Sequence, residues 1–525
     1  MGAYRHQLES ATPLQAGKPP VRRVRRVRKV RVALLLALLS ALLPGSGHLV
    51  LGRRIGYVIL GILLLLIGAG CLVTFRVPRN ELLEYVLSSQ ALLYLVGAFL
   101  LVGVLWVLVI VSTYVLAVPR RSALGRRLVG GILVAVLCAA TVTPFGYAAY
   151  TANTQRILLN TVFPAASSPG GQSATGAEIR AIRKPRINLL LVGSDAGPGR
   201  VGTRTDTIMV ASIDTKTGQA TLFSLSRNLM LARFPAGSKL AKRFPKGFTD
   251  PHSPDSPEYL LNALYSYGNE HPDLVPPGPS RIPGLNLLAA SVSTMLGLQL
   301  DYYIQVNMSG FASIIDALGG LDVNVGPRPV PIGGIGVHGE PVKPFGYIPA
   351  GLQRLNGEQA LWYARSRTNT DDYTRMGRQR CLVKYIVDQK SPAKILSNFR
   401  AVTNATSSNI ITNIPQDVLP ALVQLAMKVK NQPLESISFD PTLPILNKRN
   451  RSFDTARPDF RYMRQVVQNA ISPPRAPVSS QGKTTITRST GGTDGDAATG
   501  EAVSVTAPRA APATSLDAAC YKSQE

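Results

Sequence analysis

Three long apolar segments dominate the first third of the chain and limit what it can fold into. They are residues 55–75, 91–118 and 128–150. Each is long enough to cross a bilayer, which takes roughly 20 residues. A backbone in lipid must satisfy its own N–H and C=O groups, so such segments are helical. The sequence therefore predicts an α-helical transmembrane region, followed by a part of the chain with ordinary globular composition.

An earlier apolar segment precedes these three spans and is interrupted. Residues 32–43 reach only about half the length of a span, and Pro44-Gly-Ser-Gly-His48 then breaks the pattern. We interpret residues 32–51 as a re-entrant or interfacial segment, and a fourth full span is the alternative. The transmembrane region as a whole covers residues 32–150.

The basic residues indicate how the spans are oriented. The net charge is +27, and seven basic residues between positions 22 and 31 precede the first apolar run. The loop at 119–127 contains four arginines. Basic loops stay on the cytoplasmic side, so residues 1–31 are expected inside the cell and residue 151 onward outside it, in a multi-pass protein of the cell membrane. A basic cluster beside a membrane segment suits anionic membrane lipid, and we expect no nucleic-acid partner.

Beyond the spans the pattern changes from membrane to globular. Residues 151–184 form a linker that contains the Pro-, Ser- and Gly-rich stretch 164–178. After it, predicted strands alternate with predicted helices, which indicates a layered α/β domain. The predicted strands are residues 187–192, 207–213, 220–225, 302–306 and 321–325. The predicted helices are residues 257–267, 284–296, 309–318 with Ser309 as N-cap, 375–390 and 415–430.

Charged residues recur where the predicted strands end. Asp195 follows the first strand, Arg227 follows the third, and Arg204 and Asp206 stand two residues apart, as do Arg365 and Arg367. In extended segments such pairs project to one face. Singly, each pair could be an ordinary surface ion pair or two solvated charges. Together they favour one shared site, because charges at the ends of buried strands are costly without a ligand. Carboxylates that hold a divalent metal, with arginines that fork onto phosphate oxygens, suit a pyrophosphate.

Other chemistries lack their sequence patterns. The glycine-rich stretch at 193–199 matches neither a P-loop nor a dinucleotide fingerprint, and Ser194 is not in a G-x-S-x-G elbow. No HExxH or CxxC spacing occurs. Trp362 and the apolar residues of the helices within 257–318 are either core or the lining of a slot for a lipid chain, and periodicity does not separate these two interpretations.

Several of these segments together resemble the LytR–CpsA–Psr family. The similarity covers roughly residues 185–390, in the order typical of the family. The matching segments are Asn188–Asp195, Arg204–Thr207, Ser226-Arg227, Asp301–Tyr303, Phe311–Gly320, Gly357–Leu361 and Tyr363–Gln379. Residues 391–471 look like the helical extension of actinobacterial members. The remaining residues, 472–525, form a low-complexity tail that we expect to be disordered or to thread the cell wall.

The resemblance implies a fold, an activity and a set of site residues. The fold is a three-layer α/β/α extracytoplasmic domain with a mixed central sheet. The activity is the transfer of a phosphoglycan from a polyprenyl-pyrophosphate lipid to peptidoglycan. By motif, Asp195 and Asp206 hold Mg²⁺, with Mn²⁺ as a possible substitute. The pyrophosphate is gripped by four arginines, Arg204, Arg227, Arg365 and Arg367. Arg375 and Gln379 add contacts at the rim of the head-group site.

Two departures from the family pattern and two rival functions remain. Asn228 replaces the usual Asp after Arg227, and Leu260-Leu-Asn262 replaces the frequent Lys-Ile-Asn, which removes one expected phosphate contact. A regulatory protein that binds the lipid, described in this family as a transcriptional attenuator, is the first rival. A lipid pyrophosphatase is the second. The sequence does not name the glycopolymer or a general base.

Two cysteines lie outside the predicted spans, Cys381 and Cys520. An oxidising exterior permits a disulfide between them, which would fasten the tail to the domain. The alternative is a buried Cys381 that acts as a small apolar residue and a free thiol in the tail. The sequence alone leaves the two interpretations equally open.

Overall fold

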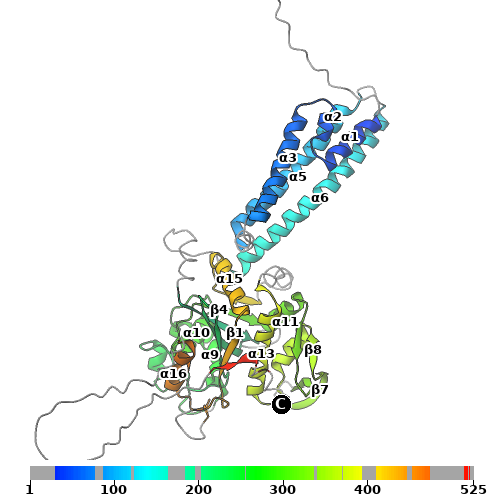
Figure 1. The fold of residues 1–525 in the computed structure, drawn as a ribbon. Helices are drawn as coiled ribbons and strands as arrows, with labels where there is room; N and C mark the ends of the chain where they lie inside the picture. Colours follow the sequence, from blue (N-terminus) through cyan, green and yellow to red (C-terminus); the bar gives the residue numbers. More distant parts are fainter. Residues whose placement is uncertain are drawn as a thin grey trace, which may run out of the picture. The chain divides into compact units, whose positions relative to one another are not determined.

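The computed structural model describes twelve stretches of the chain, which fall into two compact units. The helical unit comprises Met1–Arg79 and Leu93–Asn153, and the α/β unit comprises Asn80–Leu92 and Thr154–Glu525 (Figure 1). The predicted basic cluster at 22–29, the glycine-rich loop 196–202 and most of the tail lie outside the described residues. The described residues are 30–76, 87–119, 123–163, 184–195, 203–254, 256–335, 340–368, 370–392, 409–445, 452–472, 513–517 and 520.

The helical unit confirms the three predicted long helices. Helices α3 (Ile55–Arg76), α5 (Ser89–Ala117) and α6 (Leu124–Val162) are each long and apolar enough to cross a membrane. The earlier segment is two shorter helices, α1 (Val30–Leu42) and α2 (Ser46–Val50), separated at Gly45, whose φ of 91° suits glycine. At 1.5 Å per residue α1 is shorter than a bilayer core, which favours the re-entrant or interfacial interpretation of this segment. Residues 151–162, predicted as linker, continue α6.

Buried polar side chains attach α2 to α5. The His48 ring contacts Thr113 Oγ1 through Nδ1 at 3.0 Å and Ser112 Oγ through Nε2 at 3.2 Å. Ser40 Oγ lies 3.0 Å from the same Thr113 oxygen. Polar groups in an apolar bundle are costly unless they bond to one another, so these contacts fix the short helices against the long one.

A seven-stranded mixed sheet forms the centre of the α/β unit, as expected. Its strand order is β11-β10-β3-β2-β1-β4-β9. Strand β1 pairs in parallel with β4, and β10 pairs in parallel with β3, while the other neighbours are antiparallel. The strands are β1 (Arg186–Ser194), β2 (Thr205–Asp214), β3 (Ala220–Leu225), β4 (Tyr302–Asn307), β9 (Ile410–Thr412), β10 (Leu434–Phe439) and β11 (Thr514–Ser515).

Helices cover both faces of this sheet, which gives the three layers predicted. Alternate residues of a strand face opposite sides. Ile208 and Val210 of β2 therefore join a core with α9 (Leu264–Glu270), α10 (Pro283–Leu296) and α16 (Phe460–Ile471). Met209, between them, joins a second core with α13 (Asp372–Gln389) and α15 (Leu419–Lys430). The apolar residues of α9 and α10 that belong to the first core are buried.

A smaller subdomain lies beside the central sheet and contains two two-stranded sheets. Strand β5 (Leu321–Asn324) pairs with β8 (Leu352–Leu355), and β6 (Val330–Ile335) pairs with β7 (Pro341–Ile348). They share a core with α11 (Met308–Ala317) and α12 (Gly357–Arg365). The strand predicted at 321–325 is therefore present, but outside the central sheet. The N-cap of α11 is Asn307 and not Ser309, because the Asn307 side chain accepts a hydrogen bond from the Gly310 N–H.

Two further predictions differ from the structure. Residues 257–267 form two short 3-10 turns, η1 (Pro257–Tyr259) and η2 (Leu261–Ala263), before α9 begins, because Leu260 is extended between them. The 391–471 extension contains α15 and α16, but it also supplies β9 and β10 to the central sheet. A helical extension that begins at residue 391 is therefore wrong. The fold continues beyond residue 390 because β3 and β4 need partners along their open edges.

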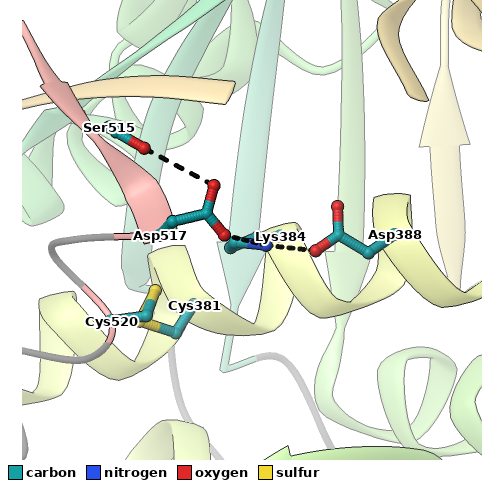
Figure 2. The surroundings of a disulfide bond; sticks show 6 residues. All are labelled: Cys381, Lys384, Asp388, Ser515, Asp517 and Cys520. Atoms are coloured by element: carbon teal, nitrogen blue, oxygen red, sulfur yellow. Dashed lines mark hydrogen bonds and ion pairs between the residues drawn. A yellow bond between two sulfur atoms is a disulfide. The ribbon is translucent and has the colours of Figure 1, made fainter. Parts of the chain in front are cut away.

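Residues 513–517 and Cys520 of the tail are part of the fold. Strand β11 pairs with β10, and Leu516 is fully buried. A disulfide joins Cys520 to Cys381 on α13 with a Cα–Cα distance of 5.6 Å (Figure 2). Lys384 on the same helix forms an ion pair with Asp517 at 2.8 Å. The disulfide interpretation is therefore the one the structure supports, and disorder is wrong for residues 513–517.

Candidate functional site

The predicted site residues that follow strands come together at one edge of the central sheet. Strand β1 ends and β2 begins at this edge, since the two are antiparallel neighbours, and β3 also ends there. The Asp195 N–H donates to the Arg204 carbonyl at 3.1 Å, and the Arg204 N–H donates to Asp195 Oδ1 at 2.7 Å. These bonds fix the two backbones where the strands part. Arg227 lies two residues after β3 ends.

A β-bulge determines where Asp206 points. Gly193 pairs with Thr207 and Ser194 pairs with Thr205, so Asp206 between them has no partner on β1. An extra residue of this kind bends its strand and redirects the side chains around it, and such bulges are common beside functional sites. Asp206 thus leaves the regular alternation of β2 at the edge where the arginines gather.

Four charged side chains form a closed ring at this edge. Arg227 Nη1 lies 2.6 Å from Asp206 Oδ1, and its Nε lies 3.1 Å from Asp372 Oδ1. Arg375 Nη2 lies 3.0 Å from the same Asp372 oxygen, and its Nη1 lies 3.8 Å from Asp206 Oδ1. Each aspartate therefore bridges both arginines. We call these four residues the charge ring.

The charge ring is unusually buried for a group of ions. The Arg375 side chain is only 2% exposed, and those of Asp372 and Arg227 are 12% and 15% exposed. Burial alone would raise the pKa of the Asp206 carboxyl, but the charges of Arg227 and Arg375 outweigh it and the pKa falls below its ordinary value. Burial likewise opposes the charge on Arg227, yet Asp206 and Asp372 raise its pKa above the ordinary value. Asp206 and Arg227 therefore both favour their charged forms at neutral pH.

The charge ring is neutral in itself, and a third arginine gives the site its positive excess. Burial, and then the charge of Arg227, lowers the pKa of Arg375, and the charge of Arg367 contributes to the same shift. Arg367 also helps to lower the pKa of Asp206. Arg367 thus acts electrostatically on two members of the charge ring, Asp206 and Arg375. One positive charge in excess is what an anionic ligand would neutralise.

Arg365 and Arg367 are not arranged as predicted. They were expected to share one face of an extended segment. Instead Arg365 is the last residue of α12, and Arg367 lies in the connection between α12 and α13. The Arg365 guanidinium lies 5.1 Å from the centre of the Trp362 ring, one helical turn earlier. The extended geometry is wrong because the capped helix α12 continues through residue 365.

Arg375 and Gln379 are also placed differently from the prediction. Arg375 was expected at the rim and is instead a buried member of the charge ring. Gln379 Nε2 donates to the Ala364 carbonyl at 3.2 Å, so this side chain ties α13 to α12. Both lie on the face of α13 that turns towards the domain. The structure brings Asp206, Arg227 and Arg375 into direct contact, with Arg367 close enough to affect them.

Two residues of the site escaped the sequence analysis. Asp372 is one, although an aspartate three residues before Arg375 on a helix is a recognisable ion-pair spacing. Arg378 is the other. It is buried, and its Nη2 donates to the Ser366 carbonyl and to Thr370 Oγ1. Arg378 therefore clamps the connection that carries Arg367.

Asp195 and Asp206 offer oxygen donors of the kind that Mg²⁺ takes in proteins. Within the described residues, no group of three or more His, Cys, Asp or Glu side chains could hold a metal. Mg²⁺ commonly takes only one or two carboxylates, together with water and substrate phosphates. Asp206 uses Oδ1 for both arginines, which leaves Oδ2 outside those ion pairs. Asp195 lies beside Arg204 on the neighbouring strand end. Two oxygen donors at one sheet edge suit this metal.

Comparison with known proteins identifies the family. The model of the LytR_cpsA_psr family matches residues 168–466, more than half of the chain. The chain belongs to this family. Biofilm regulatory protein A of Streptococcus mutans is 28% identical over 249 residues, which cover 46% of this chain and 53% of that protein. The chain thus matches about half of that relative's length.

Other relatives carry names that refer to a transfer reaction. The polyisoprenyl-teichoic acid–peptidoglycan teichoic acid transferase TagU of Enterococcus faecalis is 26% identical over 272 residues, covering 50% of this chain and 74% of that protein. The crystal structure of Bacillus subtilis TagV shows 24% identity and a TM-score of 0.38, covering 55% of this chain and 97% of that one.

Proposed function

We propose that this protein is a membrane-anchored phosphotransferase. It takes a phosphoglycan from a polyprenyl-pyrophosphate lipid and transfers it to peptidoglycan outside the cell. Family membership and the names of the transferase relatives support the reaction class. The single observation that carries the proposal is the charge ring, with Arg367 beside it, at the edge of the sheet.

The charge ring suits phosphoryl transfer because its arginines are held in place before the substrate arrives. Arg227 and Arg375 each bond to two carboxylates, so their guanidinium planes are fixed. Such groups stabilise the charge that spreads over a transferring phosphoryl group without having to reorganise. Arg367 supplies the net positive charge, and Arg378 fixes the connection that carries it.

The reaction moves one phosphorus–oxygen bond. A hydroxyl of the peptidoglycan attacks the phosphorus on the glycan side of the pyrophosphate, and the bond from that phosphorus to the bridging oxygen breaks. Polyprenyl phosphate leaves, and the hydroxyl proton passes to the leaving phosphate or to water. We propose that Asp195 and Asp206 hold a Mg²⁺ ion, or Mn²⁺ in its place, which when bound would neutralise charge on the pyrophosphate oxygens.

The test uses the full chain in proteoliposomes with a lipid-linked phosphoglycan and soluble peptidoglycan fragments. Asp206→Asn keeps the size of the side chain but removes its charge from both arginines. We expect transfer to fall by about 100-fold or more, the loss typical for one preorganised electrostatic contact. The matched control is Asp322→Asn, because Asp322 forms an exposed ion pair with Arg354 in the smaller subdomain. Wild-type transfer by Asp206→Asn would contradict the proposal.

The same assay separates the two rival functions. Release of polyprenyl phosphate without any peptidoglycan acceptor would indicate a pyrophosphatase. Lipid binding without any product, with acceptor and Mg²⁺ present, would indicate the regulatory protein that the name of the Streptococcus mutans relative suggests. A phosphotransferase requires acceptor-dependent product.

A further inference from the structure

An open groove lies on the α10–α16 side of the α/β unit, apart from the charge ring. Its volume is about 640 Å³, and residues from three parts of the chain line it. The polar lining consists of Arg233, Thr294, Arg457, Asp459 and Arg464. Phe460, the first residue of α16, forms part of its apolar floor. A space of this size holds a molecule far larger than a single phosphate ion. We call it the arginine groove.

The three arginines of this groove keep most of their hydrogen-bonding capacity. Within the described residues, none of them forms an ion pair with a carboxylate at 4.0 Å or less. Arg233 donates to the Pro245 carbonyl at 3.2 Å, and Arg464 donates to the Thr294 carbonyl at 3.4 Å. A guanidinium has five N–H donors, so these bonds orient the groups without exhausting them.

The single carboxylate in the lining does not offset this charge. Asp459 is the N-cap of α16, and its Oδ1 accepts hydrogen bonds from the Arg461 and Tyr462 N–H groups at 3.0 Å. Its charge is therefore engaged by the helix terminus. The groove thus contains three arginines and one aspartate whose charge already stabilises the start of α16. This excess of positive charge favours a ligand with several anionic groups.

A short path connects the arginine groove to the charge ring. The Met230 N–H, three residues after Arg227, donates to the Thr455 carbonyl at 2.9 Å. Thr455 Oγ1 also lies 3.2 Å from the hydroxyl of Tyr373, the neighbour of Asp372. Arg457 follows two residues later, at most about 7 Å along the chain. The loop that carries Arg457 therefore contacts chain neighbours of both Arg227 and Asp372.

We propose that the arginine groove binds the glycan part of the substrate through phosphodiester groups along the polymer. That this polymer is the substrate rests on the proposed function. That the groove binds a phosphodiester polymer does not. The groove would hold the growing or transferred chain while the charge ring holds the pyrophosphate. The ligand class is a phosphodiester-linked polyanion and not a neutral glycan.

The binding test uses the full chain in detergent with soluble poly(glycerol phosphate) as the probe. The variant is Arg457→Gln with Arg464→Gln, and the matched control is Arg281→Gln with Arg328→Gln, two exposed arginines away from the groove. The groove variant loses two charged hydrogen-bond donors, so we expect it to bind the probe at least about tenfold more weakly. The control should bind like the wild type, and added salt should weaken wild-type binding.

The possible outcomes decide the proposal. Equal binding by the groove variant and the control overturns it, as does wild-type binding of neutral dextran with the same affinity. Asp206→Asn should lower transfer by about 100-fold or more but retain binding of the polymer probe, so failure of the groove and failure of the proposed function are separable. The groove variant is also compared with the wild type on two donors. If its KM rises for a polymeric lipid-linked donor, but not for a donor whose glycan is one disaccharide without phosphodiester groups, the groove binds the donor. If only the finished polymer that is attached to the wall inhibits transfer, the groove binds the product.

Discussion

The disulfide between Cys381 and Cys520 holds a segment that would not stay bound without it. Ordering the backbone of the six described residues, 513–517 and Cys520, costs roughly 6–12 kcal/mol at 1–2 kcal/mol each. Burial of Leu516 returns about 2 kcal/mol, and the two strand pairs add about 1 kcal/mol each. The ion pair of Lys384 with Asp517 adds at most about 1 kcal/mol, since Asp517 is 57% exposed. These contacts sum to roughly 5 kcal/mol.

The cross-link accounts for the difference. It joins residues separated by 139 positions, and closing so long a loop stabilises the folded state by about 5 kcal/mol in the chain-entropy picture. With it, the total of roughly 10 kcal/mol lies within the range of the ordering cost. We therefore expect Cys520→Ser to release β11 from β10 and to expose the surface of α13 that Figure 2 shows beneath the tail.

Hydrogen exchange with mass spectrometry on the full chain in detergent measures this release. Amides of residues 513–517 should lose their protection in Cys520→Ser, and the free energy of unfolding should fall by up to about 5 kcal/mol. Cys71→Ser is the control, because Cys71 lies in the helical unit and takes no part in the disulfide. Unchanged protection of β11 in Cys520→Ser would refute the reasoning, since it would show that the non-covalent contacts suffice.

Two other predictions concern the charge ring and the membrane topology. Asp372→Asn leaves the buried Arg375 with one counter-charge and should cost about 3–5 kcal/mol in unfolding free energy, against about 1 kcal/mol or less for Asp322→Asn at the surface. Equal denaturation midpoints for the two variants would contradict a structural role for the ring. We also propose that the α/β unit is extracytoplasmic and that α3, α5 and α6 span the membrane. A fusion after residue 163 should then give active alkaline phosphatase, and green fluorescence from a GFP fusion there would contradict it.

Local sequence patterns predicted those parts of the fold whose signal is itself local. Along strands β1 to β4, side chains alternate between two faces of the sheet, or the strand follows a tight turn. The three long helices are continuous apolar segments. Strand β10 carries no such signal for its place in the sheet. It pairs with β3, more than 200 residues earlier in the chain, and its position depends on tertiary contacts that periodicity does not encode.

The candidate site shows the same limit. Residue type and position at strand ends were enough to predict that Asp206 and Arg227 belong together. The contact of Arg375 with Asp206 was not predictable, because it depends on how α13 packs against the sheet. Asp372 was missed for the same reason, since an aspartate in the first turn of a helix usually serves only the helix terminus. Burial was what distinguished both residues from solvated surface charges.

The β-bulge at Asp206 lowers the stability of the sheet at the same position where it serves the proposed activity. A β2 strand without its unpaired residue would complete the ladder with β1 and gain the hydrogen bonds that the bulge forgoes. That same repair would remove Asp206 itself, while Thr205 and Thr207 would keep their partners on β1 and therefore their faces. A selection for heat resistance should therefore enrich deletions at this corner that are well folded and inactive. Thermal tolerance alone would be a misleading guide to engineering this protein.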